Sequence, residues 1–109
     1  PGNIGNCLAC HTDDGYLLPL ADSVLATSVD TGDDRQDPSD DRVTTPTTAA
    51  CAGCHDDQVA KAHMTSNGGS FDTTQQAIDD GEVVEQCTIC HASGKANDVA
   101  TSHPVRALP

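Results

Sequence analysis

Cysteine and histidine are the residues of this chain that could do chemistry, and they follow a repeated pattern. The six cysteines form three pairs with C-x-x-C spacing, and a histidine follows each pair directly, giving CLACH, CAGCH and CTICH. These pairs are Cys7 and Cys10, Cys51 and Cys54, and Cys87 and Cys90. No cysteine is left over. C-x-x-C-H is typical of covalent haem c attachment, and three copies with the same histidine offset strongly favour it.

The spacing within each motif fits this chemistry. Two thiols presented by a C-x-x-C turn can add across the two vinyl groups along one edge of a haem. The next residue then lies beneath the iron, where an imidazole nitrogen can bind it. The sequence therefore predicts three covalently attached haem c groups, with His11, His55 and His91 as the proximal ligands.

Zinc binding and disulfide formation are the alternative interpretations of the cysteine pairs. Structural zinc sites combine such pairs into tetrahedral sets of four ligands. Three pairs and three adjoining histidines do not divide into sets of that kind. Three disulfides would suit a small secreted domain, but they would leave the regular position of the histidines unexplained. Haem attachment is therefore favoured over both.

The two histidines outside the motifs, His63 and His103, are predicted to be distal ligands. His63 follows His55 by eight residues, and His103 follows His91 by twelve. Which iron each one binds is left open. Three irons have six axial positions and the chain has five histidines, so one position takes another ligand, takes a ligand from a further segment, or stays open. Met64, the only methionine, is expected to pack in the core rather than bind iron.

The composition gives the polypeptide little material for a core of its own. Eighteen of its 109 residues are Leu, Ile, Val or Phe, and the formal net charge is -12. Few large apolar residues and a high net charge are typical of disordered chains. We therefore expect the haems to supply the interior. Because the chain has only five Lys and Arg residues, nucleic acid and anionic lipid are poor partners, whereas a basic redox protein or a positively charged mineral surface fits.

Short helices are predicted near the motifs, and loops elsewhere. The expected helices span residues 5–11, 49–64, 83–91 and 97–102. The second is expected to start at a cap formed by Thr47 or Thr48 and to end before Asn67 and two glycines. The fourth leads to His103. No run of eighteen apolar residues is present, so no transmembrane segment is predicted.

Residues 30–48 form an acidic segment with a Thr/Pro-rich end, and they are predicted to be a loop. Six aspartates fall between residues 30 and 41, a number that suggests calcium. The EF-hand pattern requires Gly at the sixth loop position and Glu at the twelfth, and the segment has neither. A solvated acidic loop is therefore preferred to a calcium site.

Longer stretches around the motifs resemble a known family. CAGCHDDQVAKAHMTSNGGSFD and CTICHASGKANDVATSHPV resemble the C-terminal haem cluster of the decahaem outer-membrane cytochromes of metal-reducing bacteria, and NCLACHTDDGYLLPLADSVLATSVDTG resembles the stretch before it. The resemblance implies a multihaem cytochrome c fold that is mostly coil, with a few short α-helices wrapped around closely packed haems and little or no β structure. It also implies distal ligation by His63 and His103, and transfer of electrons to acceptors outside the cell.

The sequence thus predicts one trihaem cytochrome c domain over residues 1–109 that acts as an electron carrier and not as an enzyme. Its expected place is extracellular, at the cell surface or in the periplasm, with redox proteins or extracellular acceptors such as metal oxides as partners. Because the family has clusters of five haems flanked by β-barrel domains, a chain with three motifs could be a whole protein, a piece that contacts a further haem-protein segment, or a self-associating filament subunit. The alternative function is a multihaem reductase with one open-coordinate iron that acts on nitrite or peroxide.

Overall fold

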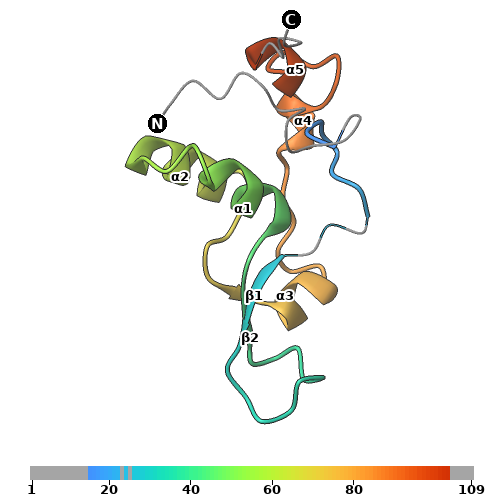
Figure 1. Ribbon diagram of the computed structural model, residues 1–109, viewed down its shortest axis with the longest axis vertical. Helices are drawn as coiled ribbons and strands as arrows, with labels where there is room; N and C mark the ends of the chain where they lie inside the picture. Colours follow the sequence, from blue (N-terminus) through green and yellow to red (C-terminus); the bar gives the residue numbers. More distant parts are fainter. Residues whose placement is uncertain (1–14, 23, 25, 104–109) are drawn as a thin grey trace, which may run out of the picture. The chain divides into compact units, whose positions relative to one another are not determined.

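The computed structural model describes residues 15–22, 24 and 26–103. The first C-x-x-C-H motif and the helix predicted around it lie outside this part. The elements of the described part are β1 (Thr27–Asp30), β2 (Asp41–Thr44), α1 (Pro46–Ala52), α2 (Gln58–Ser66), β3 (Thr73–Thr74), α3 (Gln75–Asp79), α4 (Thr88–His91) and α5 (Val99–Ser102) (Figure 1).

These elements belong to two compact units. Residues 24–86 form one, called here the central unit, which contains β1 to β3 and α1 to α3. Residues 15–22 and 87–103 belong to the other, the terminal unit, which contains α4 and α5. Each unit holds one of the two described motifs. The single domain over residues 1–109 stays a prediction.

The strands form a small antiparallel sheet in the central unit, in the order β1-β2-β3. Asp30 of β1 pairs with Asp41 of β2 at the end of this hairpin. Because strand side chains alternate between faces, Val43 points inward and is 2% exposed. Its neighbour Arg42 lies outside, where its Nε donates to Asp72 at 2.9 Å. The sheet occupies segments that were predicted to be loop. The prediction missed it because strands of two to four residues are too short to show a clear alternating pattern in the sequence.

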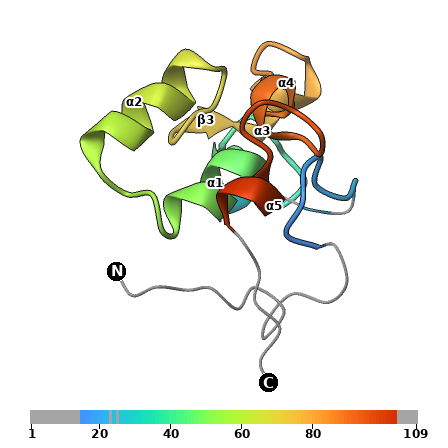
Figure 2. The same ribbon diagram turned by 90° about the horizontal axis from the view of Figure 1, so that it is seen from above.

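The single helix predicted over residues 49–64 is wrong, because the chain forms two helices there, α1 and α2, joined by a short loop (Figures 1 and 2). α1 begins at Pro46, whose fixed φ suits the first helical position, and ends before Gly53. Asp57 then starts α2, because its side chain accepts hydrogen bonds from two backbone N–H groups of the first turn. Good helix-forming residues on both sides do not prevent this break.

The ends of α1 and α2 test the predicted caps. Thr45 holds the N-cap position of α1, so the prediction of Thr47 or Thr48 is wrong; both lie in the first turn and are buried. The predicted stop after α2 is confirmed. Asn67 is its C-cap residue, and Gly68 follows with a left-handed φ of 86°, a conformation that glycine adopts without strain.

Helices α3, α4 and α5 are each five residues or shorter. The helix predicted over residues 83–91 is wrong in its start, because α4 begins after Cys87. α5 confirms the end of the last predicted helix but starts at Val99 rather than at residue 97, with Asp98 as its N-cap. α3 lies in a segment predicted as loop, where the hydroxyl of Thr74 accepts a hydrogen bond from a backbone N–H of the first turn.

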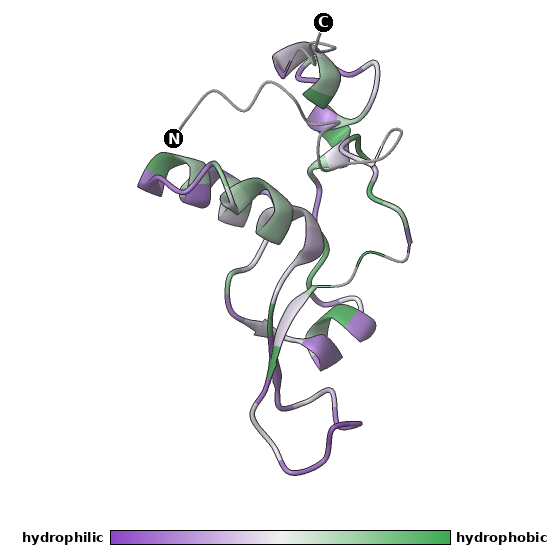
Figure 3. Ribbon diagram, viewed as in Figure 1, coloured by the Kyte–Doolittle hydropathy of each residue, from purple (hydrophilic) through white to green (hydrophobic). Residues whose placement is uncertain are grey.

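Few apolar side chains are buried. In the described residues they are Leu18, Val43 and Met64, and the burial of Met64 agrees with the packing role predicted for it. The loop between β1 and β2 is hydrophilic (Figure 3). The predicted fold class, mostly coil with short helices and little β structure, is confirmed. Within the described ranges, none of the helices has the length and apolar character needed to cross a membrane.

Candidate haem-binding site

The motif of Cys51, Cys54 and His55 starts in the last turn of α1. The carbonyl oxygen of Cys51 accepts hydrogen bonds from the N–H of Cys54 at 3.1 Å and from the N–H of His55 at 2.9 Å. These bonds make a helical turn, in which residues at positions i, i+3 and i+4 lie on the same side of the backbone. The turn therefore presents two thiols and one imidazole on one side.

The motif of Cys87, Cys90 and His91 has the same backbone geometry. The carbonyl oxygen of Cys87 accepts from the N–H of Cys90 at 3.3 Å and from the N–H of His91 at 2.9 Å. The exposure of the thiols is alike as well, since Cys51 and Cys87 are half-buried whereas Cys54 and Cys90 are exposed. The two described motifs thus share the same hydrogen-bonded turn, although the first starts at the end of α1, the second contains α4, and they lie in different units.

C-x-x-C pairs also serve thiol redox chemistry in other proteins, and the acidity of the Cys51 thiol bears on that use. Burial raises the pKa of Cys51, and the negative charge of Glu85 raises it further. Redox-active cysteines have a lowered thiol pKa, because the thiolate is the reacting form. The raised pKa therefore argues against a redox dithiol at Cys51 and Cys54.

The helix that carries Cys51 is anchored at its other end by Glu85. The Glu85 carboxylate accepts hydrogen bonds from the backbone N–H groups of Thr47 at 2.8 Å and Thr48 at 2.7 Å. It also accepts from the hydroxyls of Thr48 at 2.7 Å and Thr45 at 2.9 Å. Thr45 and Thr48 are 2% and 1% exposed. Glu85 thereby satisfies first-turn donors of α1 that have no partner within the helix.

The hydrogen bonds also decide the acidity of Glu85. Burial acts to raise the pKa of this carboxyl, but the bonds from Thr48, Thr47 and Thr45 outweigh it, so the pKa lies below its usual value. Glu85 was not among the predicted functional residues. A helix cap from a neighbouring residue can be predicted from the local sequence. Glu85, in contrast, is 37 or more residues away from the threonines that it binds, and no spacing rule predicts such a contact.

Exposed apolar side chains lie beside both motifs. Val59 of α2 is 80% exposed and stands one helical turn before His63, on the same face of the helix. Ile89, between the two cysteines of its motif, is 66% exposed. The donor set of each described motif, two thiols and an imidazole, fits a haem. Val59 and Ile89 are apolar neighbours that such a group would cover.

The ring nitrogens of His91 and His103 lie close to backbone carbonyls. Nδ1 of His91 lies 2.9 Å from the oxygen of Asn97, and Nδ1 of His103 lies 3.2 Å from the oxygen of Val99. A carbonyl oxygen can only accept, so Nδ1 is the donor in each contact. In the neutral form of an imidazole that donates from Nδ1, the lone pair lies on Nε2, which is the nitrogen that would bind iron.

Most of the predicted site residues lie in the described part of the chain. The cysteines and histidine of each described motif lie together, His63 lies on α2, after the motif at residues 51–55, and His103 directly follows α5. The remaining predicted residues, Cys7, Cys10 and His11, lie outside the described residues. Their roles, and those of the described ligands, stay predictions.

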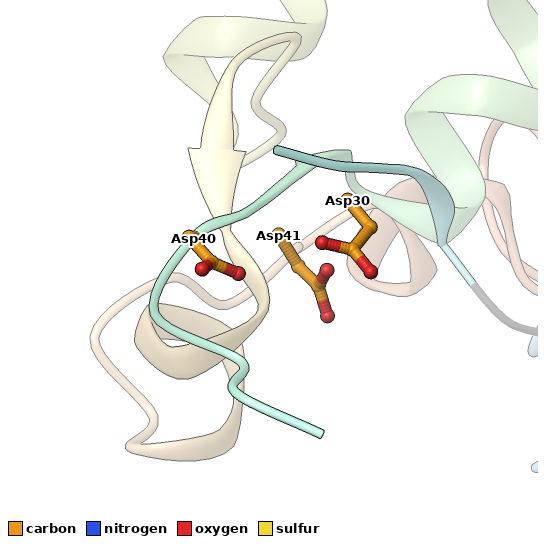
Figure 4. A group of neighbouring side chains, drawn as sticks. All are labelled: Asp30, Asp40 and Asp41. Carbon is orange, nitrogen blue, oxygen red and sulfur yellow. The ribbon is translucent and has the colours of Figure 1, made fainter. Parts of the chain in front are cut away.

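Three aspartates gather at the end of the β1–β2 hairpin (Figure 4). One carboxylate oxygen each from Asp30, Asp40 and Asp41 lies within 4.8 Å of the others. Burial raises the pKa of Asp40, and the neighbouring carboxylates raise it further. These aspartates belong to the segment predicted as an acidic loop over residues 30–48. That prediction is right only in part, because the segment also contains β2 and the start of α1.

Comparison with known proteins gives one family. Residues 1–104 match the family model described as outer membrane cytochrome MtrC/MtrF-like, domains II/IV. No curated protein and no solved structure gave a significant match. The match covers nearly the whole chain and confirms the predicted resemblance to decahaem outer-membrane cytochromes.

Proposed function

Because the chain belongs to the MtrC/MtrF-like family of outer membrane cytochromes, we propose that it is a trihaem electron carrier that passes electrons between its haems and on to acceptors outside the cell. The family consists of multihaem c-type cytochromes that act in extracellular electron transfer at the cell surface. The number of haems, their ligands and the acceptor are part of the proposal.

The helical turn shared by the two described motifs carries the proposal. In residues 51–55 and 87–91 it presents two thiols and an imidazole on one side of the backbone. The motif at residues 7–11 has the same residue types at the same spacing, which supports a count of three haems. Haem, when bound, supplies an iron that changes between the ferric and ferrous states by one electron.

The residues proposed to hold the haems are the six motif cysteines, as thioether positions, and the five histidines, as iron ligands. In chain order they are Cys7, Cys10, His11, Cys51, Cys54, His55, His63, Cys87, Cys90, His91 and His103. Two histidines on one iron leave no position for a substrate and need little rearrangement when an electron is gained or lost. Such ligation supports a carrier rather than a reductase.

One observation favours the alternative, a multihaem reductase. Five histidines for six axial positions leave one position that could bind nitrite or peroxide. A reductase also needs polar or basic side chains around the bound substrate, and the chain has only five Lys and Arg residues in total. We therefore propose the carrier, with the sixth position filled by another side chain or by a further haem-protein segment.

The charge of the chain supports the proposed partners. At a net charge of -12, a basic redox protein or a positively charged metal oxide would be attracted by the field of the protein. Self-association into filaments would extend the path for electrons from copy to copy. Electron micrographs of concentrated protein test this part, because fibres would support it and a strict monomer would contradict it.

Electron paramagnetic resonance of the oxidised protein tests the proposed function. A carrier with saturated irons predicts low-spin ferric signals from all three haems and no change when nitrite or peroxide is added. A high-spin ferric signal that changes with either molecule would favour the reductase. As a second readout, the reduced protein should be reoxidised by suspended ferric oxide; reduced protein that stays reduced would contradict the proposed acceptor.

A further inference from the structure

The loop after the motif of the terminal unit folds back onto that motif. The N–H of Asn97 donates to the carbonyl oxygen of Cys90 at 2.9 Å. The carbonyl oxygen of Asn97 faces Nδ1 of His91 at the same distance. Asn97 therefore contacts the motif through both of its backbone polar groups, and its carbonyl fixes which nitrogen of His91 carries the proton.

Asp98 holds this loop in place. One oxygen of its carboxylate accepts from the N–H of Gly94 at 2.8 Å, and the other accepts from the N–H of Ala100 at 2.9 Å. The first bond closes the loop around Gly94, which has a left-handed φ of 80°. The second caps α5, the helix that precedes His103. A single carboxylate thus joins the loop that presents the Asn97 carbonyl to the helix that leads to a second predicted ligand.

We propose that Asp98 is a positioning residue that sets the reduction potential of the haem attached at Cys87 and Cys90, by fixing the carbonyl of Asn97 against Nδ1 of His91. This inference rests on the proposed function. A hydrogen bond from Nδ1–H to a carbonyl strengthens the imidazole as an electron donor to the metal. A stronger donor favours ferric over ferrous iron, so the intact loop lowers the potential.

The negative charge of Asp98 would lower the same potential without any contribution from the loop. The test must therefore separate the charge from the hydrogen bonds. Asp98→Ala removes the charge and both acceptor oxygens. Asp98→Asn removes the same charge but keeps one acceptor oxygen, so any difference between these two variants comes from the hydrogen bonds.

Gly94→Ala supplies the complementary variant, because it keeps every charge. An added Cβ at Gly94 meets no atom within 4 Å, so the substitution acts through its left-handed φ alone and disturbs the loop. Gly81 is the matched control: its φ is 73° and a Cβ there also meets no atom within 4 Å. Gly81 lies in the central unit, away from this loop in sequence.

The experiment is a spectroscopic redox titration of the haem-loaded wild-type protein and the four variants, with electron paramagnetic resonance of the oxidised samples. We expect one of the three potentials to rise in Asp98→Ala, to rise less in Asp98→Asn, and to rise in Gly94→Ala but not in Gly81→Ala. The low-spin signal of one haem should shift in the same variants. If Asp98→Ala does not fold, the comparison of Gly94→Ala with Gly81→Ala tests whether the loop influences the potential.

Two results would overturn the inference. Equal potentials in Asp98→Ala and Asp98→Asn would show that the charge of Asp98 alone changes the reduction potential. An unchanged set of potentials in Gly94→Ala would show that the conformation of the loop does not influence the reduction potential. A wild-type protein without three reversible one-electron steps would contradict the proposed function as well, so the two failures are distinguishable.

Discussion

Removal of the Glu85 carboxylate should destabilise the central unit. Glu85→Ala leaves two backbone N–H groups and two hydroxyls without the acceptor they have now. An unsatisfied buried donor costs about 1–3 kcal/mol. The hydroxyls can rotate toward other acceptors, since the carbonyl oxygen of Ser70 lies 3.4 Å from the hydroxyl oxygen of Thr45, and water can reach the half-buried carboxylate position. The two N–H groups alone would cost about 2–6 kcal/mol. Because water can reach this position, we expect a loss at the lower end, about 2–3 kcal/mol, in the free energy of unfolding.

The assay is unfolding in guanidinium chloride followed by far-ultraviolet circular dichroism, which reports on the backbone while the haems stay covalently attached. Glu82→Ala is the matched control, since Glu82 is exposed and lies three residues earlier. Its effect should stay within about 0.5 kcal/mol, as for most surface substitutions. Equal stability of the two variants would refute the role given to Glu85, and a changed denaturant slope would show that unfolding is not two-state.

Three further predictions concern the same units. The pKa of Glu85 is lower in the folded protein than its usual value. The charged carboxylate therefore stabilises the fold above the usual pKa, and this stabilisation is lost as the pH falls through the folded pKa, so the stability gap between wild type and Glu85→Gln should shrink as the pH is lowered from neutral into the acidic range. His63→Ala or His103→Ala should turn one low-spin iron high-spin in electron paramagnetic resonance and lower the unfolding midpoint. Gly68→Ala should destabilise the central unit by about 3 kcal/mol in chemical denaturation, because a Cβ there would overlap the carbonyl oxygen of Val84 at a left-handed φ.

Each of these has its own control and contrary result. A gap between wild type and Glu85→Gln that is constant with pH would contradict the lowered pKa. Ser66→Ala, at an exposed position of α2, should leave the spin state unchanged, and a spectrum unchanged in both histidine variants would refute the distal assignments. Gly81→Ala should cost about 1 kcal/mol from its φ alone; an equal cost at Gly68 would argue against the overlap with Val84.

The sequence predicts best what is encoded by neighbouring residues. The family follows from the C-x-x-C-H repeats and their flanks, and the family comparison confirms it. The end of α2 follows from Asn67 and Gly68, because helix caps are formed within one or two turns. These features need no knowledge of the rest of the fold.

The break between α1 and α2, the sheet and the contact of Glu85 with α1 were not predicted. Gly53 and Asp57 divide one predicted helix into two, because an N-cap bond within the loop competes with continuation of the helix. The sheet depends on pairing between short strands, in which Val43 is the one residue buried on folding. Glu85 caps α1 from outside the helix altogether. The break at Asp57 is a local competition between a cap and a longer helix, whereas the sheet and the Glu85 contact are tertiary interactions that residue spacing does not reveal.

The intact mass of the protein, isolated after authentic export and maturation, tests the central claim most directly. Covalent attachment at Cys7 and Cys10, Cys51 and Cys54, and Cys87 and Cys90 predicts the mass of the polypeptide plus three haems. A polypeptide mass without haem, or six cysteines that still react with a thiol reagent, would contradict the account.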